Sequence, residues 1–237
     1  MEMRLAYTEC HNCAGREEAA EKCALRLAAE LSLAIHERGR AVMAVSVSAD
    51  TQLLFAVLSQ TDIPWSFVTL ALIDECYVPV TAPQSRERAL RAGLLQNRAA
   101  AARFVGLYNE ARTAELAAFS ASARINRLSR PFDCAVLDMD IQGQTAGFFK
   151  GSSRLQAALN REGRALVLPN YVKFSGETHL TMTLPLLAEA GLIVLPLNGR
   201  EKLSVLEEAE QEGAAKDMPV RALLRAARQP VQVFFSL

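Results

Sequence analysis

The sequence predicts an α/β fold with an open, mostly parallel sheet and helices on both faces. Short apolar runs alternate with longer segments of helical periodicity almost from end to end of the 237 residues. The apolar runs are hydrophobic at nearly every position, as strands covered on both faces are. No Pro/Gly/Ser-rich linker, low-complexity tract or internal repeat divides the chain. We therefore expect a single domain over residues 1–237.

The elements follow in a regular order. Residues 2–8 are expected to form a short strand. Apolar residues recur at helical spacing from Glu17 to Arg38, and Gly39 is a suitable stop for that helix. Further strands are expected at 41–47, 65–73, 104–107, 132–136, 191–197 and 231–235, with extended segments at 166–168 and 179–183. Further helices are expected to end near residue 60 and to span 83–95, 113–128, 201–211 and 219–227.

Composition excludes several classes of function. The formal net charge is zero, so no basic field is present to gather nucleic acid or an anionic membrane. No apolar run approaches the ~20 residues of a spanning helix, and the N-terminal residues lack the apolar core of a signal peptide. We expect a cytoplasmic protein with no nucleic-acid or membrane partner.

The five cysteines are an odd number in a chain that needs no disulfides, which is typical of reduced thiols. Cys10 and Cys13 form a C-x-x-C motif that could carry a low-pKa thiolate or two metal ligands. No second motif completes a zinc site, so we expect no metal. The ordinary interpretation is a strand-to-helix loop with Asn12 as the N-cap. Oxidative closure of Cys10 and Cys13 is the redox alternative.

The most informative segment is the loop at residues 137–149, which reads L-D-M-D-I-Q-G-Q-T-A-G-F-F and follows the apolar run at 132–136. Loops after buried strands are where α/β folds place their chemistry. This loop resembles the L-G-M-G-x-D-G-H-T-A-S-x-F signature of the 6-phosphogluconolactonases. Three other segments extend the resemblance: 63–79 is similar to P-W-x-x-V-x-F-x-x-x-D-E-R-x-V-P, 179–185 to R-x-T-x-T-L-P, and 199–202 to G-x-x-K.

The resemblance implies the fold shared by 6-phosphogluconolactonases, glucosamine-6-phosphate isomerases and ribose-5-phosphate isomerases. It also implies hydrolysis of 6-phosphoglucono-1,5-lactone to 6-phosphogluconate in the pentose phosphate pathway, without a cofactor. That reaction needs a base to activate water, donors for the developing oxyanion, and a cationic or N–H-rich phosphate pocket. Each requirement can be compared with the residues present.

The base is the first departure from the family pattern. Gln144 occupies the position of the family's general-base histidine, and a glutamine has no proton that titrates near neutral pH. Asp138 and Asp140 replace two glycines of the signature. At ~4 Å and an effective dielectric near 20, each would repel one phosphate charge by ~4 kcal/mol.

The phosphate loop also departs from the family. The family's S-G-G-S-T-P becomes S-V-S-A-D-T at residues 46–51, with Ser48 as the remaining candidate ligand. Val47 is β-branched and disfavours the positive φ that glycine allows. Asp50 adds a negative charge, and we expect it to cap the next helix.

The remaining site residues are assigned by the resemblance alone. Asp74 and Glu75 persist from the D-E-R segment, where Cys76 replaces the substrate-binding arginine. A nucleophilic Cys76 is disfavoured because the two carboxylates would raise the pKa of its thiol. The candidate catalytic residues are therefore Gln144 (degenerate), Asp74 and Glu75, and the candidate substrate-binding residues are Ser48, Cys76, Arg86, His179 and Lys202.

Arg86 stands at a family asparagine and could partly restore the lost cation, and His179 stands at a family arginine, where a hydrogen-bonded structural role is favoured. Lys202 matches its family position. We interpret the chain as a divergent 6-phosphogluconolactonase-family protein with a degenerate site and weak or no lactonase activity. The alternatives are an active sugar-phosphate lactonase with rearranged catalytic residues, and a non-catalytic protein that binds a ligand or a partner. A sugar phosphate or other small anion is the expected ligand, and either a monomer or a homodimer is compatible with the sequence.

Overall fold

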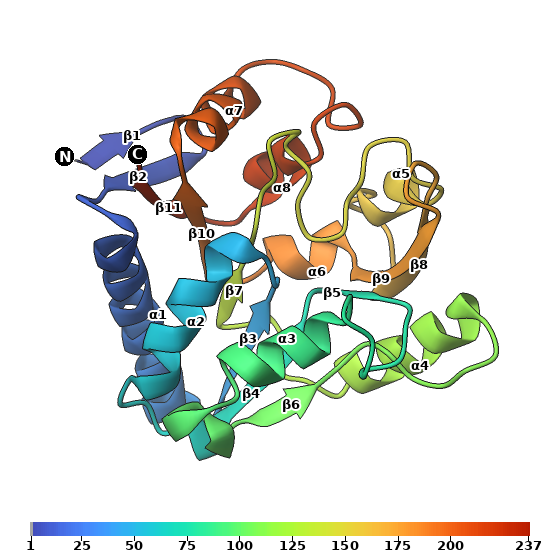
Figure 1. Ribbon diagram of the computed structural model, residues 1–237, viewed down its shortest axis with the longest axis horizontal. Coiled ribbons are helices and arrows are strands. Elements are labelled where there is room, and N and C mark those ends of the chain that lie inside the picture. The colour runs from blue at the N-terminus through green and yellow to red at the C-terminus, as the bar shows by residue number, and fades with distance from the viewer. Residues whose placement is uncertain (1) are drawn as a thin grey trace.

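The computed structural model describes residues 2–237 and confirms the predicted α/β fold (Figure 1). Eight strands form the central sheet in the order β1-β2-β11-β10-β7-β3-β4-β6. Neighbouring strands are parallel except β1 and β2, which are antiparallel. The strands are β1 (Glu2–Arg4), β2 (Thr8–Asn12), β3 (Ala41–Val45), β4 (Val68–Leu72), β6 (Arg103–Val105), β7 (Cys134–Val136), β10 (Leu192–Asn198) and β11 (Val231–Ser236).

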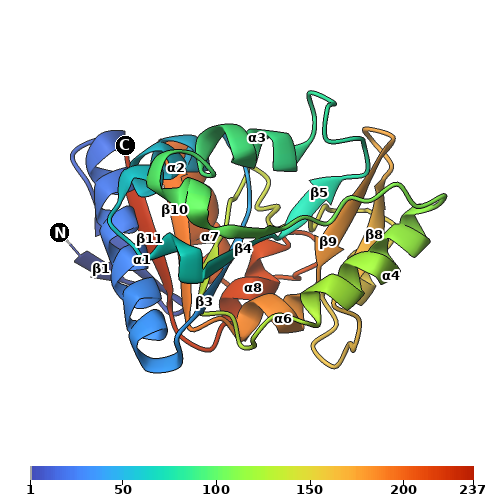
Figure 2. The ribbon, with the colours of Figure 1, turned by 90° about the horizontal axis from the view of Figure 1, so that it is seen from below.

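Helices cover both faces of this sheet. Figure 2 shows α1 on one side and α6 and α8 on the other. The central strand β3 is accordingly buried at every position, which explains why its sequence is apolar throughout. The helices are α1 (Arg16–Arg38), α2 (Ala49–Gln60), α3 (Arg86–Gly93), α4 (Ala114–Ile125), α5 (Leu155–Ala158), α6 (Leu184–Ala188), α7 (Arg200–Glu210) and α8 (Val220–Ala226), with 3₁₀ turns η1 (Trp65–Phe67) and η2 (Asn97–Ala101).

A second, smaller sheet was not predicted, although two of its strands overlap the extended segments expected at 166–168 and 179–183. Its three antiparallel strands are β5 (Asp74–Cys76), β9 (Glu177–Met182) and β8 (Val167–Val172), in the order β5-β9-β8. β5 follows β4 almost directly, so the small sheet leaves the central sheet beside the carboxyl end of β4. This arrangement brings residues near 75 and near 180 together over one end of the central sheet.

Several local expectations were wrong. The N-terminal segment forms two strands rather than one. Asn12 is the last residue of β2 and not a helix cap; α1 begins at Arg16 after Gly15. The helix expected from residue 83 begins at Arg86, because Glu75 and Ser85 cap it there. Short helices α5 and α6 were not expected.

Cys10 and Cys13 are free thiols in the structure, and burial raises the pKa of both. This is the opposite of the low pKa that a reactive C-x-x-C motif needs. No helix within residues 2–237 is both long enough and apolar enough to span a membrane.

Candidate functional site

The strand order reverses beside β3. From β3, the sheet continues to β4 and β6 on one side and to β7, β10 and β11 on the other. In an open parallel sheet, such a reversal creates a crevice at the carboxyl ends of the strands where ligands bind. The loop at 46–48 follows β3 and the loop at 137–149 follows β7, so the two loops meet at this crevice.

A cavity of about 540 Å³ lies above the crevice. Its walls come from both loops, from the start of α3, and from β5 and β9 of the small sheet. Asp74 and Glu75 are completely buried beneath it, whereas Ser48 and Lys202 lie outside its lining. The other four residues singled out by the sequence do line it: Cys76, Arg86, Gln144 and His179.

The loop after β3 caps the helix that follows it, α2. Ser48, not the expected Asp50, is the N-cap of α2, and its backbone N–H donates to Thr51 Oγ1 at 2.9 Å. Asp50 lies in the first turn and forms an ion pair with Lys202, and it also accepts a hydrogen bond from Asn198 Nδ2 at 3.0 Å. The lysine that matches the family pattern is therefore already neutralised by a carboxylate of this chain.

Arg86 is also paired within the chain. Its guanidinium forms an ion pair with the carboxylate of Asp74, whose side chain is fully buried while that of Arg86 is 20% exposed. Burial raises the pKa of Asp74, and the positive charge of Arg86 opposes that shift. The other oxygen of this carboxylate, Oδ1, has no hydrogen-bond partner. Arg86 therefore faces the cavity with a positive charge that is largely neutralised by the buried carboxylate of Asp74.

Glu75 has a structural task. Its carboxylate accepts hydrogen bonds from the backbone N–H groups of Arg86 and Glu87, both at 2.7 Å, and from Ser85 Oγ at 3.1 Å. The two backbone groups are among the donors at the start of α3 that have no partner within the helix. Burial raises the pKa of Glu75, while these three donors act in the opposite direction. Glu75 therefore fixes the helix that carries Arg86.

Asp140 organises the loop after β7. Its Oδ1 accepts hydrogen bonds from the backbone N–H groups of Gln142 and Gln144, at 2.8 and 2.9 Å. Its Oδ2 accepts from the side-chain amide of Gln144 at 2.7 Å. The carbonyl oxygen of that amide accepts from the backbone N–H of Lys150 at 2.9 Å. Both ends of the Gln144 side chain are thus engaged, and it is only 7% exposed.

The same loop packs tightly on the buried carboxylates. Gly147 has a φ of +73°, and a Cβ there would lie 2.8 Å from Asp74 Cβ and 3.1 Å from Thr181 Cβ. Only glycine fits this position without strain. Burial, followed by the charge of Asp74, raises the pKa of Asp138 to about 6, while Arg86 lowers it. Two carboxylates and one guanidinium therefore share the floor of the site.

Cys76 and His179 are cross-strand partners on β5 and β9. The sulfur lies 3.9 Å from Nδ1 and 4.0 Å from Nε2 of the imidazole, so it is directed at neither nitrogen. Burial, and then Arg86, lower the pKa of His179 to about 4, so its imidazole is neutral at pH 7. Burial raises the pKa of Cys76 to about 11, so its thiol is protonated. A neutral pair of this kind does not supply a thiolate nucleophile.

The sequence missed two neighbours of His179. The Phe149 ring lies 4.8 Å from the imidazole, and Glu177 Oε2 lies 3.6 Å from Nε2. Glu177 is two residues before His179 on β9, so the alternation of a strand could have indicated that their side chains share a face, whereas Phe149 comes from the loop after β7 and is brought there by tertiary folding. Across residues 2–237, no three His, Cys, Asp or Glu side chains form a group that could hold a metal ion.

Comparisons with known proteins agree with this architecture. The family model for glucosamine-6-phosphate isomerases/6-phosphogluconolactonase matches residues 14–232. The 6-phosphogluconolactonase of Rhizobium meliloti (strain 1021) is 41% identical over 217 residues, covering 92% of this chain and 94% of that protein. That of Mesorhizobium japonicum is 41% identical over 221 residues, covering 93% and 92%.

A solved structure gives the same result for the fold. The crystal structure of a 6-phosphogluconolactonase from Shewanella baltica OS155 superposes with a TM-score of 0.94 at 34% identity, covering 99% of this chain and 100% of the other. The match extends over both sheets because it covers nearly every residue of each chain. The chain therefore belongs to the glucosamine-6-phosphate isomerase/6-phosphogluconolactonase family.

Proposed function

We propose that this chain is a 6-phosphogluconolactonase-family protein with weak or no lactonase activity that keeps the pocket as a small-ligand site. One observation carries the proposal. The side chain at the family's general-base position is Gln144, an amide that does not titrate and that Asp140 and Lys150 hold at both ends. A positioned general base contributes about 10²- to 10⁴-fold to a rate, so we expect a loss of that size.

The anion-binding side of the pocket supports the same proposal. The two candidate cations, Arg86 and Lys202, are each paired with a carboxylate of this chain. A phosphate would have to compete with Asp74 for Arg86, and with Asp50 for Lys202. Strong charge-assisted contacts need a donor that is free to turn toward the ligand. We expect a sugar phosphate such as 6-phosphogluconate to bind weakly.

His179 favours a second candidate, an active lactonase with a relocated base. Its imidazole lines the cavity and is neutral at pH 7, as a general base must be before it accepts a proton. A pKa near 4 makes it a weak base, however, because proton transfer is most effective when the pKa lies close to the working pH. We therefore place this candidate second.

The test is hydrolysis of freshly generated 6-phosphogluconolactone, measured against its spontaneous hydrolysis. We expect no acceleration beyond a small fraction of that given by the Rhizobium meliloti relative in the same assay. Gln144→Ala and His179→Gln are the paired variants. A large acceleration that survives Gln144→Ala and disappears in His179→Gln would replace the first proposal with the second.

Restoring the base alone should not restore the rate. We expect Gln144→His to remain inactive, because Asp140 would hold the new ring and the cations would stay paired. Calorimetric titration with 6-phosphogluconate measures the ligand separately from the chemistry. Rescue of hydrolysis by this single substitution would show that the rest of the site is competent, which contradicts the proposal.

A further inference from the structure

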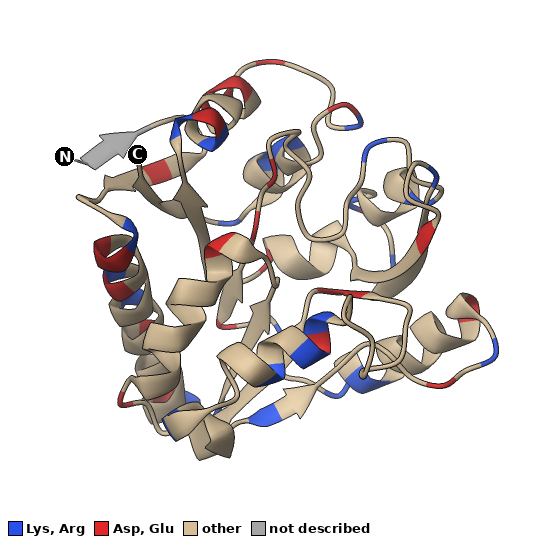
Figure 3. Ribbon diagram, in the orientation of Figure 1, with Lys and Arg blue, Asp and Glu red and all other residues tan. Residues whose placement is uncertain are grey.

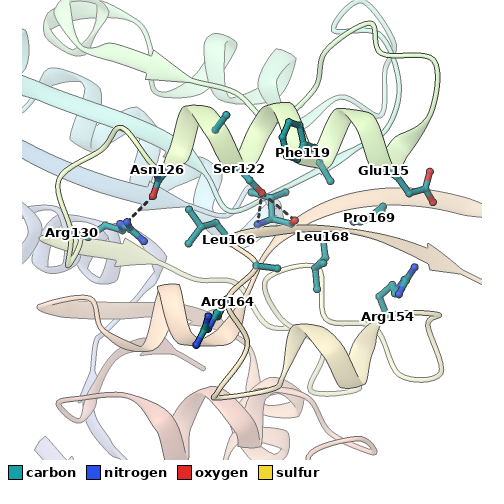
Figure 4. Close-up of a pocket in the computed structure, with 14 residues that line it drawn as sticks. Glu115, Phe119, Ser122, Asn126, Arg130, Arg154, Arg164, Leu166, Leu168 and Pro169 are labelled. Atoms are coloured by element: carbon teal, nitrogen blue, oxygen red, sulfur yellow. Dashed lines mark hydrogen bonds between the residues drawn. The ribbon is translucent and has the colours of Figure 1, made fainter.

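A groove on the far side of the small sheet is independent of the candidate site. It lies between α4 and β8, has a volume of about 790 Å³, and shares no lining residue with the pocket at His179 (Figure 4). We call it the α4–β8 groove. It is lined by Ala118, Phe119 and Ala123 of α4 and by Leu166, Leu168 and Pro169 at β8.

The floor of the groove is suited to an apolar partner. The α4 residues that line it, from Glu115 to Asn126, recur at three- and four-residue spacing and so form one face about three turns long. Two of them are alanines, which leave room for another backbone to approach. Phe119 on this face is 76% exposed, a large apolar area that the fold itself does not use.

The edge of β8 cannot receive another strand. Val167 exchanges backbone hydrogen bonds with the Ser122 hydroxyl, which accepts at 3.1 Å and donates at 3.3 Å. Tyr171 donates to Ser153 Oγ and accepts from the Ser153 backbone N–H, both at 3.0 Å. Between them, Pro169 has no N–H to offer. An occupant must therefore bind through side chains, which suits a helix rather than an extended peptide.

The rim of the groove is basic. Arg130, Arg154 and Arg164 line it and are exposed, and Glu115 is the single acidic residue among the lining residues. In the described part of the chain, the side chains of Arg154 and Arg164 form no ion pair, and Arg130 donates only to Asn126 Oδ1 at 2.8 Å. Figure 4 shows Arg130 and Arg154 at opposite ends of the groove with Arg164 between them.

The spacing of the three arginines favours some kinds of ligand over others. A fatty acid or a single phosphate would need cations that converge at one point, whereas separated guanidiniums suit a segment with several carboxylates along its length. A second copy of this chain does not supply one. Of its two glutamate-rich helices, α7 lies on another side of the molecule (Figure 3) and already buries its apolar residues Leu206 and Ala209. The outer side of α1, which exposes Leu25 and Leu33, also carries Lys22 and Arg26 and is therefore of mixed charge. We propose that the α4–β8 groove binds an acidic amphipathic helix of another protein.

The test uses a labelled 18-residue helical probe with leucines at i, i+3, i+4 and i+7 and glutamates flanking them. Fluorescence anisotropy with the whole protein should show saturable binding, and a scrambled peptide of the same composition should not bind. The double variant Arg154→Glu/Arg164→Glu should weaken binding at least about tenfold, and Glu115→Gln should tighten it about twofold. Arg200→Glu, the same charge change at the start of α7, should change it less than about twofold.

Other results would overturn the proposal. These are no binding at about 1 mM protein, equal binding of the scrambled peptide, or equal weakening by Arg200→Glu. Displacement of the probe by laurate at low concentration would assign the groove to a lipid. Concentration-dependent self-association that Ala123→Trp abolishes would assign it to a second copy. Unchanged unfolding midpoints of the variants keep each result interpretable, and Ala123→Trp, which fills the groove, should also abolish probe binding.

Discussion

The Asp74–Arg86 pair offers the most direct test of how the site is held. Arg86→Met removes the cation and leaves a fully buried carboxylate whose other oxygen already lacks a partner. Removing one member of a buried pair costs about 3–5 kcal/mol. The carboxyl limits this cost by taking up a proton, so we expect a loss of about 3 kcal/mol in the free energy of unfolding at pH 7. For a chain of this size that lowers Tm by about 6–12 °C.

The cost of Arg86→Met in the free energy of unfolding should depend on pH in a predictable direction. Without Arg86, which opposes the rise, the folded-state pKa of Asp74 moves further above its unfolded value, so the folded variant binds more protons than the unfolded chain above that unfolded pKa. A group with a raised folded pKa stabilises the protein at low pH and loses that contribution as pH rises. The difference between variant and parent should therefore shrink as the pH falls from 7 to 5, by at most about 1.4 kcal/mol per pH unit for one proton.

Urea unfolding at the two pH values measures both quantities. Asp74→Asn/Arg86→Met removes both charges and should cost less than Arg86→Met alone, because no buried charge is left unpaired. The matched control is Arg98→Met, which breaks the pair with Asp62, an exposed pair that should contribute little. A cost below about 1 kcal/mol for Arg86→Met at pH 7, or a difference that does not shrink on acidification, would refute the reasoning.

Three further predictions follow from the site and the cysteines. Gly147→Ala should lower the free energy of unfolding by about 2–3 kcal/mol in urea, whereas Gly176→Ala, with the same φ of +73° and nothing within 4 Å, should cost about 1 kcal/mol; equal costs would show that the contact with Asp74 is unimportant. His179 should titrate near pH 4 in NMR spectra, and because its folded pKa is depressed, its contribution to stability should be lost as pH falls from about 6.5 to 4; titration near 6.5 would contradict its burial. Thiol counting on the denatured chain should give five free cysteines with and without reductant; a count of three without it is not expected, and peptide mapping of any such sample would show whether Cys10 and Cys13 are the pair.

The central sheet was predictable because its evidence is local. Strands such as β3 and β10 are apolar runs buried on both faces, and a buried parallel strand needs no other sequence signal. The small sheet was not predictable in the same way. β5 is a three-residue strand of sequence D-E-C, and β8 contains Pro169 and Asn170. The pairing of β5 with β9 joins residues about a hundred positions apart.

The candidate site was also only partly predictable from the sequence. The types of residue at positions 144 and 76 could be judged from the sequence, because a glutamine cannot serve as a base in any fold. The partners could not be judged. Lys202 forms an ion pair with Asp50, 152 positions away in the sequence. The guanidinium of Arg86 forms an ion pair with Asp74 and is therefore not free for a ligand. Whether a cation is free depends on tertiary contacts, which a motif does not contain.

The position of Glu75 has a consequence for how members of this family are sorted by sequence. Its three hydrogen bonds hold the first turn of α3, so a carboxylate there would stabilise the fold, by about 1 kcal/mol, even in a chain with no reaction to perform. A sequence search that takes the Asp-Glu dipeptide as evidence of hydrolase activity would therefore be detecting a residue that stabilises the fold. Under the function proposed above, the residue at position 144 is the better mark of activity, because a histidine there could act as a base and a glutamine could not.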